Sequence, residues 1–426
     1  MSSLLDRLGV PRRINAAGTL TRLGGALMDA EVLRAMQDAA SASVDIAQLQ
    51  SAASRRIAAL TGAEAGLVTS GASAGLTLAT AACLAGWDAA RMAALPDTRG
   101  MRSRMLMLRQ HRNSYDHAVR LAGASLADVG HNDRGTGAGV RTLEAWELEA
   151  AIDEQCAGFV FVATPSSLAC LPVVLAVMHR HGLPVIVDAA AQLPPAANLR
   201  RFVEQGADLV VFSGGKALGG PQASGLLIGR RDLIGSALLQ MMDMDVHPET
   251  WAPADLVDRH ALRGTPLHGI GRGFKVGKEE IAGLLCALER FVARDEVAQR
   301  RAWAARLQAV ADALRGIGLP DRHGAPTWRV SLHPATQPVA AGVGGEAPVP
   351  WLELALTRDG RPDPGAALAL CRRLHARPLP VHLGEGRLDE GVLTVNPLAL
   401  RPEDDAALAD ALSEALTFLS ASIETP

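Results

Sequence analysis

The chain has 426 residues, of which 48 % are hydrophobic and 20 % are charged, so it can form about two or three globular domains. Its formal net charge of −3 gives no basic surface for nucleic acids or anionic membranes, and we expect neither as a partner. Five scattered cysteines without a CxxC pair indicate neither a zinc site nor a disulfide framework, so we expect no metal and a reducing, cytoplasmic location.

Two stretches of the chain bear on membrane targeting. Residues 1–13 lack an apolar run behind a basic start, so we expect no export signal. Residues 65–87 carry no charge over a length that could cross a bilayer, but the polar stretch SGAS interrupts them. We interpret them as a buried strand, a tight turn and a buried helix.

Short apolar runs of strand length recur along the first two-thirds of the chain, most of them followed by small residues and a helical pattern. Strands are predicted at Gly66–Thr69, Met105–Leu108, Gly158–Ala163, Pro184–Val187, Ala207–Phe212 and Gly225–Ile228. Helices are predicted at Leu143–Asp153, Pro172–His181 and Asn198–Gln205. Because the apolarity is continuous rather than alternating, both faces of these strands should be buried. The pattern predicts an α/β fold with a mostly parallel central sheet covered by helices.

A smaller α+β domain is predicted after a long helical run from Lys278 to Arg315. Its strands are expected at Thr327–Leu332, Trp351–Thr357, Pro380–His382 and Val392–Val395, its helices at Gly365–Ala376 and Glu403–Ser420, and a loop at residues 340–350. We therefore expect an N-terminal segment (1–50), a large α/β domain (51–300) and a small C-terminal domain (301–426).

The stretch FSGGKALGGPQASG contains one of only three lysines in the chain, Lys216; the others are Lys275 and Lys278. Where cations are otherwise arginines, a lysine indicates a position that needs a primary amine, which can lose its proton and attack a carbonyl. The stretch is not a P-loop, because that motif needs glycine and Ser or Thr where Val210 and Ala217 stand.

Polar and small residues follow the predicted strands at the point where each strand ends. They are Ser70, Gly71 and Ala72 after the first strand, His111 and Arg112 after the second, Thr164 and Ser166 after the third, Asp188 after the fourth, and Ser213 and Lys216 after the fifth. Because parallel strands end at one common edge, where ligands bind in open α/β sheets, we expect these residues to share a crevice.

This set of residues fits pyridoxal 5′-phosphate. A lysine amine forms a Schiff base with this cofactor, and a carboxylate keeps its pyridine nitrogen protonated. Backbone N–H groups at a helix start can hold its phosphate. Asp188 and Lys216 lie 28 positions apart, about one strand–helix–strand unit of ~30 residues. Taken alone, Asp188 could be a helix cap and His111 an interior histidine; the combination favours the cofactor.

The chain resembles fold-type-I pyridoxal-phosphate enzymes, in particular the branch of selenocysteine synthase (seryl-tRNA selenium transferase) and the D-glucosaminate-6-phosphate ammonia-lyases. The resemblance rests on INAAGTLTRLGG, LTGAEAGLVTSGASAGL, PVIVDAAAQLPP, GADLVVFSGGKALGGPQASGLLIGRRDLI and GIGRGFKVGKEEIAGLL. The ammonia-lyases are the better match, because the matching segment starts at Ile14, where selenocysteine synthase has a preceding tRNA-binding region. The chain also lacks a basic patch for tRNA.

The resemblance implies a role for individual residues. Lys216 would form the Schiff base and Asp188 would pair with the pyridine nitrogen. Ser70, Gly71, Ala72 and Ser213 would hold the phosphate, His111 would stack on the ring, and Gln192 would complete the cofactor site. Arg272 and Lys275, and less directly Asn15 and Arg22, would bind the substrate. The fold also implies a homodimer or larger homo-oligomer with shared active sites.

The resemblance further implies a lyase that removes ammonia by α,β-elimination from a β-hydroxy amino acid, sugar-derived or phosphorylated, to give a 2-keto acid. The alternatives are another pyridoxal-phosphate enzyme (an aldolase, racemase or aminotransferase) and a non-catalytic cofactor-binding regulator. Two departures affect the substrate side. GRGF at residues 271–274 replaces an expected proline and apolar residue after the arginine, and Asn396 stands where many of these enzymes have an arginine, which leaves Arg387 as a substitute.

Overall fold

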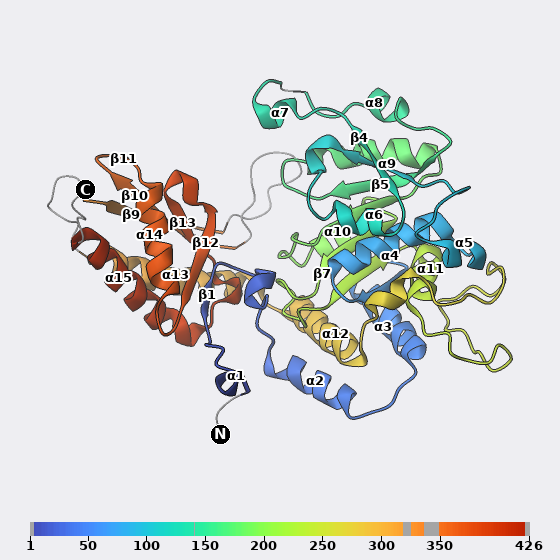
Figure 1. Ribbon diagram of the computed structural model, residues 1–426, viewed down its shortest axis with the longest axis horizontal. Coiled ribbons are helices and arrows are strands. Elements are labelled where there is room, and N and C mark those ends of the chain that lie inside the picture. The colour runs from blue at the N-terminus through green and yellow to red at the C-terminus, as the bar shows by residue number, and fades with distance from the viewer. Residues whose placement is uncertain (1–3, 140, 318–324, 336–348, 422–426) are drawn as a thin grey trace. The chain divides into compact units, whose positions relative to one another are not determined.

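The computed structural model describes residues 4–139, 141–317, 325–335 and 349–421, and Figure 1 shows their arrangement. The described chain forms two compact units. The first contains residues up to 27 and from 294 onward, and the second contains residues 28–293. The divisions predicted after residues 50 and 300 stay predictions, because compactness does not define independently folding domains.

The second unit is built on a seven-stranded sheet in the order β2-β8-β7-β6-β5-β3-β4. Its strands are β2 (Ala65–Thr69), β3 (Arg104–Leu108), β4 (Ser125–Val129), β5 (Cys156–Val162), β6 (Val185–Asp188), β7 (Leu209–Ser213) and β8 (Gly225–Gly229). Only β8 runs antiparallel to its neighbours. The predicted mostly parallel α/β sheet is therefore confirmed. Its inner strands are buried on both faces, as for Val185, Ile186 and Val187 of β6.

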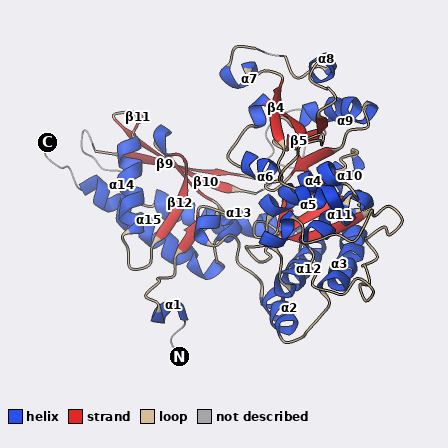
Figure 2. Ribbon diagram, turned by 45° about the vertical axis from the view of Figure 1, so that its right-hand side comes forward, coloured by secondary structure: helices blue, strands red, loops and turns tan. Residues whose placement is uncertain are grey.

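Helices flank this sheet (Figure 2). They are α2 (Ala30–Ala40), α3 (Ile46–Thr61), α4 (Ala72–Ala85), α5 (Ala89–Ala94), α6 (Asp116–Leu121), α7 (Asp133–Thr136), α8 (Ala145–Glu149), α9 (Leu171–Arg180), α10 (Asn198–Glu204), α11 (Arg231–Met241) and α12 (Lys278–Ala293). The apolar helix α4 contacts β5, β6, β7 and β8. As the SGAS interruption predicts, the uncharged segment forms the buried strand β2, a turn and buried α4. No helix within the described residues is long and apolar enough to cross a bilayer.

The first unit has a six-stranded sheet in the order β1-β12-β13-β10-β11, with β9 paired to β10. Its strands are β1 (Ile14–Ala16), β9 (Thr327–His333), β10 (Trp351–Arg358), β11 (Arg361–Pro362), β12 (Val381–Arg387) and β13 (Val392–Val395). Its helices are α1 (Leu4–Arg7), α13 (Glu296–Arg315), α14 (Pro364–His375) and α15 (Asp405–Ala421). Leucines of α13, α14 and α15 pack with leucines of the sheet in one core. Residues 336–348, most of the predicted loop, lie outside the described residues.

Two predicted helices differ from the structure. The run predicted from Lys278 to Arg315 is two helices, because the Asp295 side chain accepts hydrogen bonds from the N–H groups of Val297 and Ala298 and so caps the start of α13. The helix predicted at Leu143–Asp153 covers only α8, which starts at Ala145 with a capping box between Glu144 and Glu147.

Candidate active site

The ends of the parallel strands bring most of the predicted site residues to one edge of the large sheet. Val162 at the end of β5 lies beside Asp188 of β6, and Asp188 lies beside Val211 of β7. The N–H of Val162 donates to Nδ1 of His111 across 3.1 Å, so His111 stands at the same edge. Ser213 ends β7, three residues before Lys216. The cofactor roles assigned to these residues stay predictions.

Asp188 and Lys216 lie close enough to influence one another's charge. Burial raises the pKa of the Asp188 carboxyl, while a hydrogen bond from the N–H of Ala190 (3.0 Å) and the charge of Lys216 oppose the rise. Burial also lowers the pKa of the Lys216 ammonium, against the opposing effect of Asp188. The Lys216 amine has no hydrogen bond or ion pair within the described residues. A lowered pKa leaves more of the amine neutral near pH ~7, and the neutral form is the one that acts as a nucleophile or base.

His111 is buried, with only 4 % of its surface exposed. Because Nδ1 accepts the Val162 N–H, the neutral ring carries its proton on Nε2, and this buried atom has no partner in the described part of the chain. Burial lowers the pKa of His111 to about 4. The neighbouring Arg112 is paired with Asp116 and Asp128 at 2.5 and 2.6 Å. His111, rather than Arg112, therefore has an unused polar atom at the sheet edge.

No side chain caps the start of α4, so its first backbone N–H groups are suitably placed for an anion. Gly71 precedes the helix with φ 105° and ψ 162°, a conformation that side chains other than glycine rarely adopt. The hydroxyl of Ser70 donates to the carbonyl of Phe274 (2.6 Å), which fixes the turn before Lys275 beside this helix start. A Cβ on Gly225 would collide with Gly71 and come within 2.7 Å of the Ala72 nitrogen.

Gln192 joins two strand ends. Its side-chain amide donates to the carbonyl of Ala163 after β5 (2.7 Å), and its backbone carbonyl accepts from the Asn198 amide (2.7 Å). The residue predicted as part of the cofactor site therefore holds the loop after Asp188 in place. Whether it also contacts a cofactor stays a prediction.

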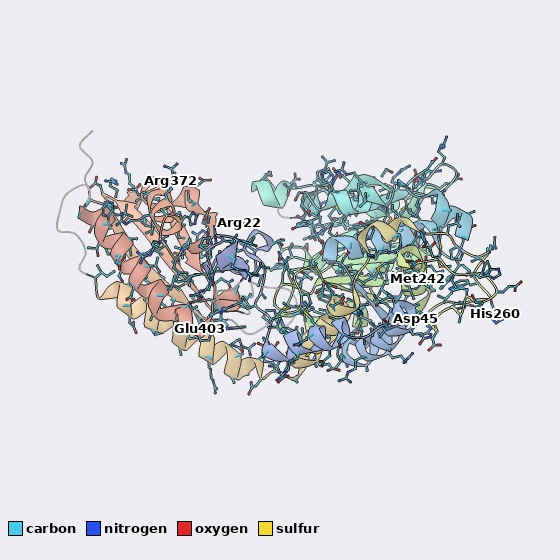
Figure 3. The ribbon with its side chains drawn as sticks, turned by 60° about the horizontal axis from the view of Figure 1, so that its bottom comes forward. Arg22, Asp45, Met242, His260, Arg372 and Glu403 are labelled. Atoms are coloured by element: carbon cyan, nitrogen blue, oxygen red, sulfur yellow. The ribbon has the colours of Figure 1, made fainter. Side chains whose placement is uncertain are left out.

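The predicted substrate residues are spread over both units. Arg272 forms an ion pair with Asp243 (2.7 Å), so its guanidinium is partly engaged, while the exposed Lys275 has no ion-pair partner in the described residues. Asn15 and Arg22 belong to the first unit, where Figure 3 labels Arg22. Asn15 bonds the carbonyl of Gly18 (2.9 Å), and Arg22 lies 3.5 Å from Glu385. Their substrate roles stay predictions.

Asn396, which stands where many of these enzymes have an arginine, and Arg387, the proposed substitute, both have partners within the first unit. Arg387 pairs with Glu353 and Glu390 at 2.8 and 2.7 Å. The side chain of Asn396 accepts from the N–H of Leu398 (2.9 Å). The guanidinium of Arg387 is therefore not free for a substrate in this arrangement.

A cavity that sequence reasoning missed lies where β3 and β4 end. Its volume is about 440 Å³, and its lining includes Leu108, Gln110, Val129, Arg141, Glu147 and Ser166. These residues come from separate stretches of the chain, so the sequence does not show that they line one cavity. Glu147 in particular reads only as a capping residue of the short helix α8. The cavity shares the strand-end edge with His111 and offers both charged and hydroxyl groups.

Comparisons with known proteins identify the family. A sequence model described as "SelA: L-seryl-tRNA selenium transferase" matches residues 171–243, the stretch that holds Asp188 and Lys216. The chain is 34 % identical to the D-glucosaminate-6-phosphate ammonia lyase of Salmonella typhimurium over 344 residues, which cover 78 % of this chain and 82 % of that relative. The chain belongs to the D-glucosaminate-6-phosphate ammonia lyase family.

Two further comparisons extend this relationship within the ammonia lyase family and beyond it. The solved structure of a D-glucosaminate-6-phosphate ammonia-lyase matches with a TM-score of 0.75 and 28 % identity, covering 99 % of this chain and 100 % of that one. A 5'-C-glycyluridine monooxygenase-decarboxylase from Streptomyces is 30 % identical over 427 residues, 96 % of this chain and 91 % of the relative. The fold is that of fold-type-I pyridoxal-phosphate enzymes, so the predicted family and fold type are confirmed.

Proposed function

We propose that the chain is a pyridoxal-phosphate-dependent lyase that removes ammonia from a β-hydroxy amino acid with a sugar-derived, phosphorylated skeleton. The product would be a 2-keto acid. The observation that carries the proposal is the half-buried pair of Lys216 and Asp188 at the strand ends, in a chain 34 % identical to an ammonia lyase.

The residues at the sheet edge fit pyridoxal 5′-phosphate. Within the described part of the chain, the Lys216 amine has no hydrogen bond or ion pair, the start of α4 is uncapped, and Nε2 of His111 is buried without a partner. A bound cofactor would contact all three of these groups, and Lys216 would be its covalent attachment. Its phosphate would lie on the N–H groups at the α4 start, helped by Ser213, and its ring would lie beside His111. When bound, the cofactor supplies an electron sink for charge that develops at the substrate Cα.

Lys216 and Asp188 would have different roles in the reaction. Lys216, whose pKa burial lowers, would take the proton from the substrate Cα as a neutral amine. In its protonated form it would then give a proton to the departing β-hydroxyl, so that water leaves. Asp188 would face the ring nitrogen and keep it protonated. Addition of water to the released enamine gives the 2-keto acid and ammonia, which balances the reaction.

The cavity near His111 is a suitable place for the distal part of a substrate. Arg141 pairs with Glu144 (2.9 Å) and Glu147 (3.7 Å) and would exchange these partners to bind a phosphate, and Gln110 and Ser166 offer hydrogen-bonding groups for hydroxyls. Two similar enzymes have names that specify an amino acid group on a sugar-containing skeleton. One is an ammonia lyase of a glucosaminate phosphate, and the other is an enzyme of a glycyluridine.

A second candidate function is oxidative decarboxylation of such an amino acid. It is favoured by the relative from Streptomyces, which matches 96 % of this chain and is named a monooxygenase-decarboxylase. The two functions share the cofactor residues and differ in co-substrate and products. One releases ammonia without oxygen, and the other consumes oxygen and releases carbon dioxide.

One pair of assays separates the two candidates. The enzyme is incubated with D-glucosaminate 6-phosphate with and without oxygen, and ammonia, 2-keto acid and oxygen uptake are measured. We expect equal ammonia and keto acid, independent of oxygen, and none with Lys216→Ala. Oxygen-dependent turnover of a glycyl nucleoside, without ammonia release from the sugar acid, would instead favour the second function.

We also propose a cytoplasmic homodimer or larger homo-oligomer whose active sites are shared between subunits. The described N-terminal residues expose large apolar side chains on the isolated chain, among them Leu20, Leu27 and Leu33. Such side chains support burial against a second copy of the chain. Arg272 and Lys275 would then lie near the site of the neighbouring subunit.

A further inference from the structure

Three side chains that commonly bind metals gather in the first unit, outside the site described above. They are His375 at the end of α14 and His382 and Glu385 on β12. Their candidate ligand atoms all lie within 4.8 Å of one another. Nε2 of His375 is 3.7 Å from Oε1 of Glu385, and the centroids of the two imidazole rings are 4.2 Å apart. The proposed lyase reaction uses none of the three.

The two histidines of this cluster have unused ring nitrogens. His382 is only 7 % exposed, and neither of its ring nitrogens has a hydrogen-bond partner in the described part of the chain. Nε2 of His375 is likewise buried without a partner there. A buried polar atom left unsatisfied lowers the stability of the native state, so an occupant that accepts an imidazole lone pair would recover part of that stability.

An irregularity in β12 lets both of its residues reach one point. In a regular strand, side chains three positions apart point to opposite faces of the sheet. The pairing of β12 with β13 shifts register between Gly384 and Arg387, and this interval contains Glu385. The Glu385 carboxylate can therefore lie on the same side of the strand as His382. The turn after α14 brings β12 back beside His375.

We propose that His375, His382 and Glu385 bind a divalent transition-metal ion of the Zn²⁺ type, with the remaining position open to water. Two imidazoles and one carboxylate suit zinc, whereas magnesium and calcium prefer oxygen ligands. Ligand atoms of a tetrahedral zinc ion lie about 3.4 Å apart, given bonds of about 2.0–2.1 Å. The observed 3.7 Å between His375 and Glu385 needs only a small adjustment. Both side chains are partly exposed, at 34 % and 37 %, which leaves a route for entry.

The nearby Arg22 raises the alternative of an anion held by this arginine and the two imidazoles. Nη2 of Arg22 is 3.5 Å from Oε1 of Glu385, so it can serve as the outer partner of a metal-binding carboxylate. Oε1 of Glu385 lies 3.5 Å from Arg22 and 3.7 Å from His375, and its charge would repel an anion from the same space. The carboxylate therefore favours a cation. The expectation of no metal rested on cysteine spacing, which says nothing about this His–His–Glu set.

Zinc titration of the purified full-length holoenzyme tests the site. Chelator-treated protein is titrated with Zn²⁺ by calorimetry and with Co²⁺ by visible spectroscopy, beside the variants His382→Gln and His375→Gln. We expect one tight ion per chain, a tetrahedral Co²⁺ spectrum, and an affinity that falls more than about a hundredfold in either variant, beyond the cost of an outer-partner change. We also expect zinc to raise the Tm of the wild type but not of the variants.

Two matched controls separate this site from other histidines. His333→Gln removes a histidine 3.7 Å from Glu353 in the same unit, and His268→Gln removes the histidine beside the exposed Asp243 and Asp245. Both variants should bind zinc as the wild type does. Zinc binding that is lost in His268→Gln but retained in His375→Gln, or no zinc binding in the wild type, would overturn the proposal.

Discussion

His111 illustrates how one buried residue links the site to stability. Its Nδ1 is occupied by the Val162 N–H, and its Nε2 is buried without a partner in the described chain. A proton added at low pH would place a charge in this buried environment. The native state therefore keeps His111 neutral down to a pKa of about 4, while the unfolded chain takes up the proton near the ordinary value of 6.5.

The consequence is a loss of stability as the pH falls. The contribution of His111 is fully present above the unfolded pKa and is lost as the pH falls from 6.5 towards 4, by about 2–3 kcal/mol at pH ~4.5. His111→Phe keeps a ring and removes the titration. Urea unfolding at pH ~7.5 and ~4.5 should show a smaller acid-induced loss in the variant by this amount. An equal loss in both proteins would contradict the prediction. His382, also with a pKa of about 4, contributes equally to both and cancels in the comparison.

The sequence predicted the site residues better than their contacts. Lys216 and Asp188 follow long apolar strands and could be placed at the sheet edge from the pattern alone. The choice between His111 and Arg112 depends on Asp128, which lies on the next strand, so the sequence could not decide it. His375 and His382 come together only because the chain reverses between a helix and a strand.

At the scale of elements, the approach of β8 to the start of α4 shapes the proposed phosphate site. Gly225, the first residue of β8, lies against the backbone of Gly71 and Ala72. Both contacting groups are backbone, so they cannot turn aside as a side chain would. The N–H groups at the start of α4 depend on this contact for their position.

Gly225→Ala should therefore weaken cofactor binding. The added Cβ would force the start of α4 away, at the cost of about 1–3 kcal/mol typical of overpacking. That corresponds to an increase of about 5- to 150-fold in the Kd for pyridoxal phosphate. Fluorescence titration of the apoenzyme measures it. Gly386→Ala, where no atom lies within 4 Å of the added Cβ, is the control. Unchanged affinity in Gly225→Ala would contradict the assignment of the phosphate to this helix start.

Element boundaries followed from the sequence where burial was complete. The strands at residues 65–69, 104–108 and 209–213 lie within two residues of their predicted bounds, because both faces are apolar. Ser125–Val129 was not predicted, because this edge strand is mostly exposed or half-buried and carries no apolar run. The break between α12 and α13 depends on one capping aspartate, Asp295, within a strongly helical composition.

At the scale of the whole molecule, we expect more than one chain in the active enzyme. Light scattering should give a mass at least twice the 44.5 kDa of one chain. Leu33 on α2 is 49 % exposed, and Leu33→Asp should shift the protein towards the mass of one chain because a charge cannot be buried in an apolar interface. Leu121→Asp, at a position 54 % exposed on α6, is the control. A wild type with the mass of one chain at assay concentrations would contradict this expectation.

The central claim is that Lys216 carries pyridoxal phosphate, and one spectroscopic measurement tests it most directly. Visible absorption of the purified protein is recorded before and after borohydride, for the wild type, Lys216→Ala and Lys278→Ala. Lys278 is the matched control, because its amine binds the carbonyl of Ala40 (3.1 Å) and supports structure. We predict an imine band that borohydride bleaches in the wild type and in Lys278→Ala, and that is lost or altered in Lys216→Ala. A wild type that stays colourless with added pyridoxal phosphate, or an unchanged band in Lys216→Ala, would contradict the account.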